Sequence, residues 1–344
     1  MFHPERVADW HRGKNIYPIY MEVSPSGACN HRCLYCGLDF MGYQAKFLET
    51  GIFKKRLTEM GKLGLKSIMY AGEGEPFLHK DIVEIVNHTK NSGIDVAFTT
   101  NAVFLKKEIA KDILQNTAWI KVSINGATKE TYAKIHRCKE QDFDNVINNL
   151  NAAVKIRKEN KHKCALGMQL LLLPDNSHEA VKLAKLAKDL GLDYLVIKPY
   201  SQHPQSKTKK YRSIKYNDFS YLADDLAKLN SKEFSVIFRI NTMEKWDKAE
   251  KGYNRCLALP FWSYIDSEGN VWGCSVFLKD DRFYYGNIYE STFKEIWEGK
   301  RRKASLEWSQ DKLDASKCRL NCRMDEINRY LWGIKNPQNH INFI

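Results

Sequence analysis

Short apolar segments alternate with amphipathic segments through residues 17–200 of the chain. Apolar segments with the length of buried strands lie at residues 19–23, 67–70, 95–99, 119–123, 167–173 and 194–197. Between them, the sequence predicts helices at residues 47–63, 82–89, 106–114, 143–154 and 179–190. Six strands separated by helices predict an α/β fold with a parallel sheet covered by helices.

The pattern changes near residue 214. Beyond it, the sequence predicts a helix, a strand, a hairpin and a closing helix, at residues 216–229, 234–240, 265–271 and 326–332. The hairpin is indicated by a turn of Asp, Ser, Glu, Gly and Asn between apolar runs. We therefore expect two domains, residues 1–213 with an N-terminal extension at 1–16, and residues 214–344.

The length and composition predict an intracellular protein with a sizeable hydrophobic core. Its 344 residues are 43% hydrophobic, which is enough for a sizeable core. No apolar run reaches the length of a membrane span, and residues 1–17 lack the apolar segment of a secretory signal. The nine cysteines are an odd number in a chain too long for a disulfide scaffold, so we expect metal binding in the reducing cytoplasm.

The net charge of +13 comes from lysines spread over the whole chain. The most basic stretch, residues 207–215, is either a solvated loop or a surface that attracts a phosphate, a nucleotide or another acidic substrate. Because no long basic block is present, nucleic acid is not expected as a partner.

Three cysteines, Cys29, Cys33 and Cys36, lie within eight residues after the first predicted strand. Carboxyl ends of barrel strands are where barrel enzymes place their chemistry. Three thiolates can bind an iron–sulfur cluster and leave one iron free for another ligand. Two alternatives stay open on spacing alone: a zinc site with His31 as the fourth ligand, and ordinary thiols.

With Tyr35 before the last cysteine, this loop resembles the signature of the radical S-adenosylmethionine (radical SAM) superfamily. The resemblance covers residues 17–200 and implies a partial, TIM-like (β/α)6 barrel. It also implies that the three cysteines hold a [4Fe-4S] cluster whose fourth iron binds S-adenosylmethionine. An electron donor such as flavodoxin or ferredoxin would then drive cleavage of this cofactor to a 5′-deoxyadenosyl radical, which takes a hydrogen atom from the substrate.

Further strand ends resemble the cofactor contacts of this superfamily. Residues 70–76 resemble its Gly-Gly-Glu-Pro turn, with Glu73 in place of a glycine, and residues 99–102 and 123–127 resemble two further strand ends. There Ala102 replaces a glycine and Asn125 an aspartate. The resemblance assigns cofactor contacts to Tyr35, Gly74, Glu75, Asn101, Ser123 and Arg137. Gln169, a lone amide in an apolar strand, is either a satisfied core residue or a contact to adenosine or substrate.

Four cysteines in the C-terminal part could bind zinc or a second [4Fe-4S] cluster; they are Cys256, Cys274, Cys318 and Cys322. A glycine five residues before Cys274 and the hairpin around it resemble the SPASM/twitch extension of radical SAM enzymes. With only four cysteines, the segment resembles the shorter twitch form, which implies one auxiliary cluster.

Two cysteines remain. Cys164 precedes a buried strand and is expected to be a core thiol. Cys138 follows Arg137 near the end of the fourth strand. Some epimerases of the superfamily return a hydrogen atom to the substrate from a thiol, so the resemblance makes Cys138 a candidate catalytic residue.

The expected reaction is oxidation or epimerisation of a small polar molecule such as a sugar, an aminocyclitol or a nucleotide sugar. Modification of a peptide or protein is the alternative within the superfamily. Since 28 residues precede Cys29 and 22 follow Cys322, we do not expect the leader-binding domain that peptide-modifying relatives often carry. A hypothesis of another class is a zinc-stapled binding protein with a basic surface.

Overall fold

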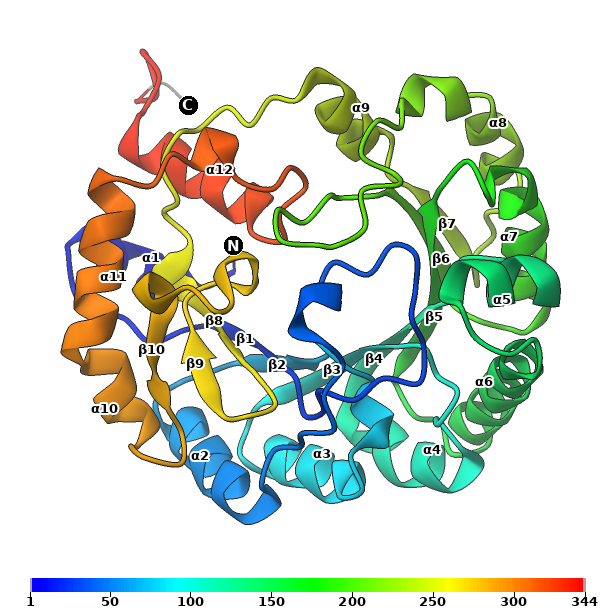
Figure 1. The fold of residues 1–344 in the computed structure, drawn as a ribbon, viewed down its shortest axis with the longest axis horizontal. Coiled ribbons are helices and arrows are strands. Elements are labelled where there is room, and N and C mark those ends of the chain that lie inside the picture. The colour runs from blue at the N-terminus through cyan, green and yellow to red at the C-terminus, as the bar shows by residue number, and fades with distance from the viewer. Residues whose placement is uncertain (1, 343–344) are drawn as a thin grey trace.

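A computed structural model describes residues 2–342. Ten strands form a single curved sheet in the order β10-β9-β8-β1-β2-β3-β4-β5-β6-β7 (Figure 1). All neighbours from β8 to β7 run parallel, and β9 and β10 are antiparallel additions at one edge. The chain is therefore a mixed α/β protein built on a parallel sheet.

The six predicted strands are confirmed. They are β1 Tyr20–Val23, β2 Ser67–Tyr70, β3 Asp95–Thr100, β4 Thr117–Ser123, β5 Ala165–Leu172 and β6 Tyr194–Pro199. Their order in the sheet follows their order in the chain, as expected for a partial barrel built from repeated strand–helix units.

Helices cover the outer side of the curved sheet, so that one side chain in two along each strand enters the main core (Figure 1). The helices between the strands are α2 Thr50–Lys62, α3 Ile82–Asn91, α4 Lys107–Ile113, α5 Lys129–His136, α6 Gln141–Glu159 and α7 Ala180–Asp189. All but α5 were predicted. The helix α5 has few apolar residues, and its start is fixed by Thr128, whose hydroxyl accepts a hydrogen bond from the N–H of Thr131.

The C-terminal part continues the same sheet at both edges. The strand β7 Ser235–Phe238 pairs with β6, and β8 Trp262–Ile265 pairs with β1. The predicted hairpin is formed by β8 and β9 Asn270–Trp272, and β10 Tyr284–Asn287 completes it. The boundary at residues 213/214 lies between β6 and β7 and stays a prediction.

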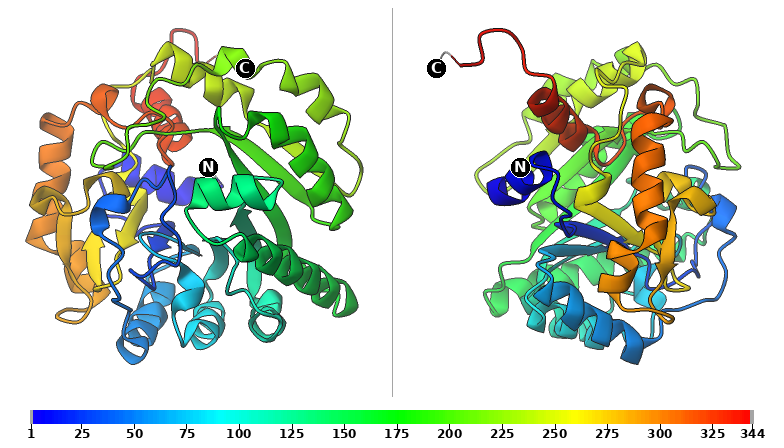
Figure 2. Two further views of the ribbon diagram at one scale, coloured as in Figure 1. Left: turned by 45° about the vertical axis from the view of Figure 1, so that its right-hand side comes forward. Right: turned by 90° about the vertical axis from the view of Figure 1, so that its left-hand side faces the viewer.

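Five helices belong to the C-terminal part: α8 Leu222–Ala227, α9 Ile240–Lys248, α10 Phe293–Glu298, α11 Lys300–Asp311 and α12 Asp325–Lys335. The single helix expected at 216–229 is instead a short 3-10 turn followed by α8. The N-terminal helix α1 Pro4–His11, which was not predicted, packs against α12 through Val7 and Leu331 (Figure 2).

No helix within residues 2–342 combines the length and the apolar character that a membrane crossing needs.

Candidate functional site

The loop that carries Cys29, Cys33 and Cys36 follows β1 and lies over the face formed by the carboxyl ends of the strands (Figure 1). Its backbone is fixed to the end of α5, because the N–H groups of Arg32 and Leu34 donate to the carbonyls of His136 and Ile135, at 3.1 and 2.9 Å. The Ser206 hydroxyl also donates to the carbonyl of Cys36, at 3.1 Å. These bonds hold the cysteine loop in one conformation.

The three thiols of this loop lie close enough to affect one another's ionisation. The pKa of Cys33 is raised by burial and then by the charges of Cys36 and Cys29. Burial also raises the pKa of Cys29 to about 12, with the carboxylate of Glu75 as the next cause. Thiols that resist ionisation when gathered without a cation become good ligands once iron offsets their charge.

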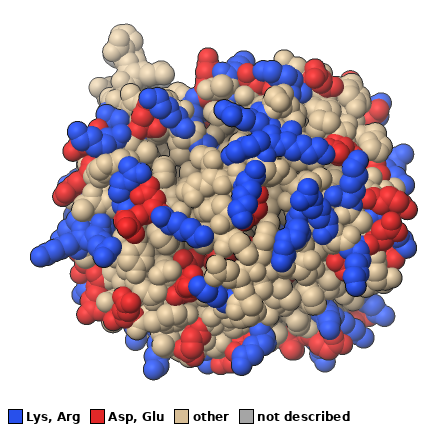
Figure 3. All heavy atoms as spheres, viewed as in Figure 1, with Lys and Arg blue, Asp and Glu red and all other residues tan. Residues whose placement is uncertain are grey.

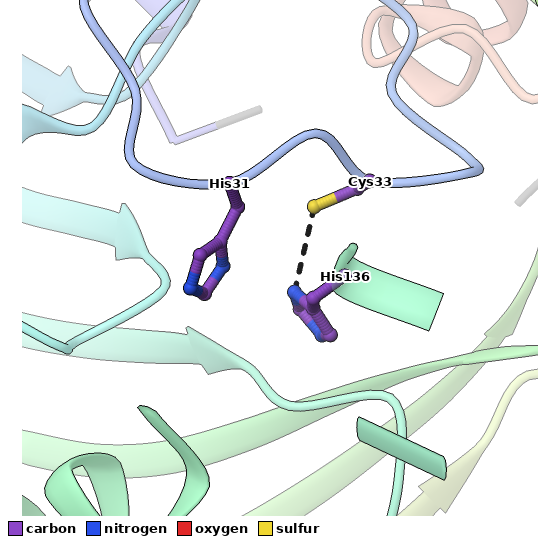
Figure 4. Close-up of side chains that lie close together, drawn as sticks. All are labelled: His31, Cys33 and His136. Atoms are coloured by element: carbon purple, nitrogen blue, oxygen red, sulfur yellow. Dashed lines mark hydrogen bonds between the residues drawn. The ribbon is translucent and has the colours of Figure 1, made fainter. Parts of the chain in front are cut away.

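A buried histidine lies behind the loop (Figure 4). His136 Nδ1 is 3.4 Å from the sulfur of Cys33, and its Nε2 is 3.0 Å from the carbonyl oxygen of Ile124. Burial lowers the pKa of His136, so its ring is neutral in this environment. Tyr35 also approaches this ring, with its hydroxyl 3.5 Å from Nδ1. His136 was not predicted from the sequence, where its one signal is its place just before Arg137.

His31 does not complete the zinc site that the spacing left open. Its Nε2 lies 3.0 Å from the carboxylate of Asp142. Two groups of possible ligand atoms include His31, one with Cys33 and His136 (Figure 4) and one with Cys138 and Asp142, and the atoms of each group lie within 4.8 Å of one another. Neither group contains more than one of the three loop cysteines, so both differ from a site of three thiolates and one imidazole.

The turn after β2 lies directly against the cysteine loop. A methyl group added at Gly74 would lie 2.2 Å from the carbonyl oxygen of Ala28 and 2.3 Å from that of Ser26. The N–H of Glu75 donates to the same carbonyl of Ala28, at 2.8 Å. Only glycine permits this approach, so the turn and the loop form one surface.

The carboxylate of Glu75 is buried beside the cysteines. It accepts hydrogen bonds from the N–H groups of Asn101, at 2.8 Å, and Phe77, at 3.2 Å, and from the hydroxyl of Thr100. Burial raises its pKa to about 7, against the effect of these donors. Within residues 2–342 this carboxylate has no cationic partner, and a buried carboxylate of this kind at the edge of the cysteine loop is suited to receive an ammonium group.

The other predicted cofactor contacts lie at neighbouring strand ends. Asn101 donates from its side-chain amide to Asn30 of the cysteine loop, at 2.8 Å. Ser123 on β4 pairs in register with Gln169 on β5. Gln169 is 5% exposed, and within the described residues its side-chain oxygen is buried without a hydrogen-bond partner. A buried oxygen of this kind needs a donor from a ligand or a water molecule.

Arg137 and Cys138 lie at the end of α5. Arg137 is exposed and has a left-handed backbone with φ of +48°. Cys138 is half-buried near His31 and Asp142 and packs against the core between sheet and helices. Their assigned roles stay predictions.

Two of the departures from the superfamily pattern have local explanations. Glu73 accepts a hydrogen bond from the N–H of Ser267 in the C-terminal hairpin, at 2.7 Å. Asn125 accepts one from the N–H of Leu171 on β5, also at 2.7 Å. Both side chains therefore join segments of the fold.

The four C-terminal cysteines line one pocket. Its wall also contains Trp262, Phe277 and Phe283, and the cysteines are Cys256, Cys274, Cys318 and Cys322. Backbone N–H groups of Val276 and Met324 donate to the sulfurs of Cys274 and Cys322, each at 3.4 Å. Four thiolates are a complete ligand set for a cubane cluster. All nine cysteines of the chain are free of disulfides.

The residues present fit the groups that the sequence implied. The donor set of three loop thiols, the buried Glu75 beside them and the unpartnered oxygen of Gln169 suit a cluster with an amine-bearing nucleoside ligand. The pocket of four thiols suits a second cluster.

Comparisons with known proteins agree with this geometry. The radical SAM superfamily profile matches residues 23–187, and that of the SPASM iron–sulfur cluster-binding domain matches residues 256–323. The chain is 28% identical over 228 residues to a probable GTP 3′,8-cyclase of Methanocaldococcus jannaschii, covering 60% of this chain and 73% of that protein. It is 22% identical over 320 residues to the tungsten-containing aldehyde ferredoxin oxidoreductase cofactor-modifying protein of Pyrococcus furiosus, covering 82% and 81%.

The fold is similar to that of Streptococcus suis SuiB bound to S-adenosylmethionine, with a TM-score of 0.66 and 18% identity over 96% of this chain and 78% of SuiB. SuiB has also been solved with its precursor peptide SuiA, again with a TM-score of 0.66. The chain therefore belongs to the radical SAM superfamily, with a cluster that binds S-adenosylmethionine and a SPASM-type C-terminal domain that implies auxiliary iron–sulfur binding.

Proposed function

We propose that this enzyme holds a [4Fe-4S] cluster through Cys29, Cys33 and Cys36 and removes a hydrogen atom from a substrate bound on the inner face of the sheet. The cluster and S-adenosylmethionine, when bound, together supply a 5′-deoxyadenosyl radical. One observation carries the proposal. The three thiols lie beside the buried carboxylate of Glu75, which has no cationic partner within residues 2–342, at the carboxyl ends of neighbouring strands.

The protein's own residues position and shield the cofactor in this proposal. Glu75 receives the amino group of S-adenosylmethionine, and Gly74 lets the backbone approach it. Gln169 accepts a hydrogen bond through the oxygen that has no partner within residues 2–342. Tyr35, Asn101, Ser123 and Arg137 are the further proposed contacts. An apolar patch of the inner face, formed by Tyr20, Met69, Ala97 and Trp119, limits the access of water to a radical.

The pocket lined by the C-terminal cysteines is the proposed site of an auxiliary [4Fe-4S] cluster. Four thiolates saturate such a cluster, so its role is electron transfer rather than cofactor cleavage. If the reaction is a dehydrogenation, this cluster accepts the second electron. The first electron comes from a donor protein such as flavodoxin or ferredoxin in a reducing compartment, and the nine unpaired thiols support that setting.

The favoured substrate is a small polar molecule that is oxidised or epimerised. The two named relatives support it, since one is a nucleotide cyclase and the other modifies a cofactor. Peptide modification is the second candidate, and the solved complex of SuiB with its peptide favours it. At 16% identity that likeness shows the fold alone, so we rank it second.

Metal and product analysis of anaerobically prepared protein tests the proposal. We expect about eight irons per chain with matching sulfide, and reductive cleavage of S-adenosylmethionine to 5′-deoxyadenosine. The Cys29→Ala/Cys33→Ala/Cys36→Ala variant should lose about four irons and all cleavage, while the buried core variant Cys164→Ala keeps both. Residual cleavage in the triple variant, or zinc in place of iron, would contradict the proposal.

A further inference from the structure

Lysine and arginine side chains gather on the inner face of the sheet, where the proposed substrate lies. Lys121 is two residues before Ser123 on β4, so it projects to the same side of the sheet. Lys198 on β6 pairs in register with Leu171, two residues beyond Gln169, and also shares that side. Both lysines therefore lie next to the proposed cofactor contacts.

Three arginines approach the same space from other segments. Arg239 follows β7, and Arg319 and Arg323 belong to the segment that carries Cys318 and Cys322. The pKa of Lys198 is lowered by burial and then by the positive charges around it, those of Lys121, Arg323, Arg319 and Arg239. Burial, Arg323 and Arg239 likewise lower the pKa of Lys121, to about 8.

The acidic counterpart of these cations is small. Glu22 on β1 is 6% exposed and forms an ion pair with Arg323, with 2.9 Å between Oε2 and Nε. Arg319 donates to the hydroxyl and the carbonyl of Ser201, at 2.8 and 3.0 Å, and neither acceptor carries a charge. Glu22 therefore offsets the charge of Arg323, and the charge of Cys322 acts on both Arg319 and Arg323. The lysines are the cations that these groups leave without a counter-charge.

The two lysines have no such compensation. Within residues 2–342, neither ammonium group has a carboxylate at ion-pair distance, and Lys121 lies 5.1 Å above the ring of Trp119. Neither lysine is adjacent in sequence to a cysteine, so their charge is not explained by a cluster beside them. Like charges gathered on one face repel one another, and a site retains them when a ligand supplies the opposite charge.

We propose that the substrate is a small molecule carrying a phosphate or diphosphate group, which Lys121 and Lys198 bind on the inner face of the sheet. This inference rests on the function proposed above. A single carboxylate brings one negative charge, whereas a phosphate monoester brings about −1.5 to −2 at pH 7 together with three acceptor oxygens. The excess of positive charge is therefore better matched by phosphate. Figure 3 shows that Lys and Arg side chains also gather over the central part of the face seen there, through which an anion would be attracted.

Binding of inorganic pyrophosphate to the full-length, cluster-reconstituted protein tests this inference. Calorimetry under anaerobic conditions should show binding that weakens at least tenfold in Lys121→Gln and in Lys198→Gln. The matched control Lys54→Gln, a surface lysine paired with Glu84, should bind as the unaltered protein does. Glu22→Gln removes the carboxylate that pairs with Arg323 and should tighten binding. This gain keeps the test valid even if a lysine variant folds poorly.

Three outcomes would overturn the inference: no binding of pyrophosphate, equal binding by the lysine variants, or binding of citrate as tight as that of pyrophosphate. Iron content and 5′-deoxyadenosine formation are measured on the same samples. Normal clusters and cofactor cleavage without pyrophosphate binding refute the phosphate inference alone. Pyrophosphate binding that depends on both lysines, in a protein that never cleaves S-adenosylmethionine, refutes the proposed function.

Discussion

The carboxylate of Glu73 accepts a hydrogen bond from the backbone N–H of Ser267, at a distance of 2.7 Å. This bond joins the turn after β2, which carries Gly74 and Glu75, to the tip of the C-terminal hairpin, 194 residues further along the chain. The strand β8 of this hairpin pairs with β1, which leads into the cysteine loop. The bond therefore holds the turn after β2 and the C-terminal hairpin together at the carboxyl ends of these strands.

We predict that Glu73→Ala destabilises the fold by about 1–3 kcal/mol, because it leaves the buried N–H of Ser267 without an acceptor. Thermal or urea unfolding of the full chain measures the effect. The control Glu84→Ala removes an exposed glutamate paired with Lys54 and should change stability by less than about 0.5 kcal/mol. Equal stability of the two variants would mean that the hydrogen bond between Glu73 and Ser267 does not stabilise the fold.

We predict that Gly74→Ala prevents assembly of the first cluster. The added methyl group meets two backbone carbonyls, of Ala28 and Ser26, which can move only if the cysteine loop moves. Iron content should fall by about four per chain, with loss of 5′-deoxyadenosine formation. Gly333→Ala is the matched control, since nothing lies within 4 Å of the added atom and α12 should gain up to about 1 kcal/mol. Normal iron loading in Gly74→Ala would refute the tight contact.

The strands β1 to β6 could be predicted because each is a short apolar run. The helices between them have apolar residues that recur with the period of an α-helix. The cysteine loop was predicted from its resemblance to the radical SAM signature, which needs no knowledge of the fold because its cysteines lie in one loop. The pairing of β8 with β1 was not predicted, because it joins residues about 240 positions apart and depends on the whole topology. His136 and Lys121 were missed, and the direction of Lys198 at the end of the sixth strand could not be predicted, because a strand or helix pattern does not tell which polar side chain turns inward.

We predict that the C-terminal cysteines hold iron independently of the first cluster. Cys256→Ala removes one of the four thiols that line the second pocket, which leaves a cubane there without its full ligand set. Iron should fall from about eight to about four per chain, while cleavage of S-adenosylmethionine continues and full turnover stops. Unchanged turnover in this variant would mean that the second cluster only supports the fold, and unchanged iron would refute the assigned ligands.

We predict that pyrophosphate affinity falls as the pH rises through about 8, because burial lowers the pKa of Lys121 to about 8 and only its protonated form attracts an anion. The charged groups that face this lysine are Glu22 on β1, Lys198 on β6, Arg239 beyond β7 and Arg323 from the C-terminal segment. Below the lowered pKa the ammonium is present and binding is strong; above it, each pH unit costs up to tenfold, or about 1.4 kcal/mol.

Lys121→Arg supplies the control, since a guanidinium stays charged throughout this range while the ionisation of pyrophosphate itself is unchanged between the two proteins. The ratio of the two dissociation constants should therefore be near one at pH 7 and should grow at pH 9, when the unaltered protein loses its charge at position 121. A ratio that stays constant from pH 7 to pH 9 would show that Lys121 does not titrate against the bound anion, and the phosphate contact would then have to be carried by Lys198 and the arginines.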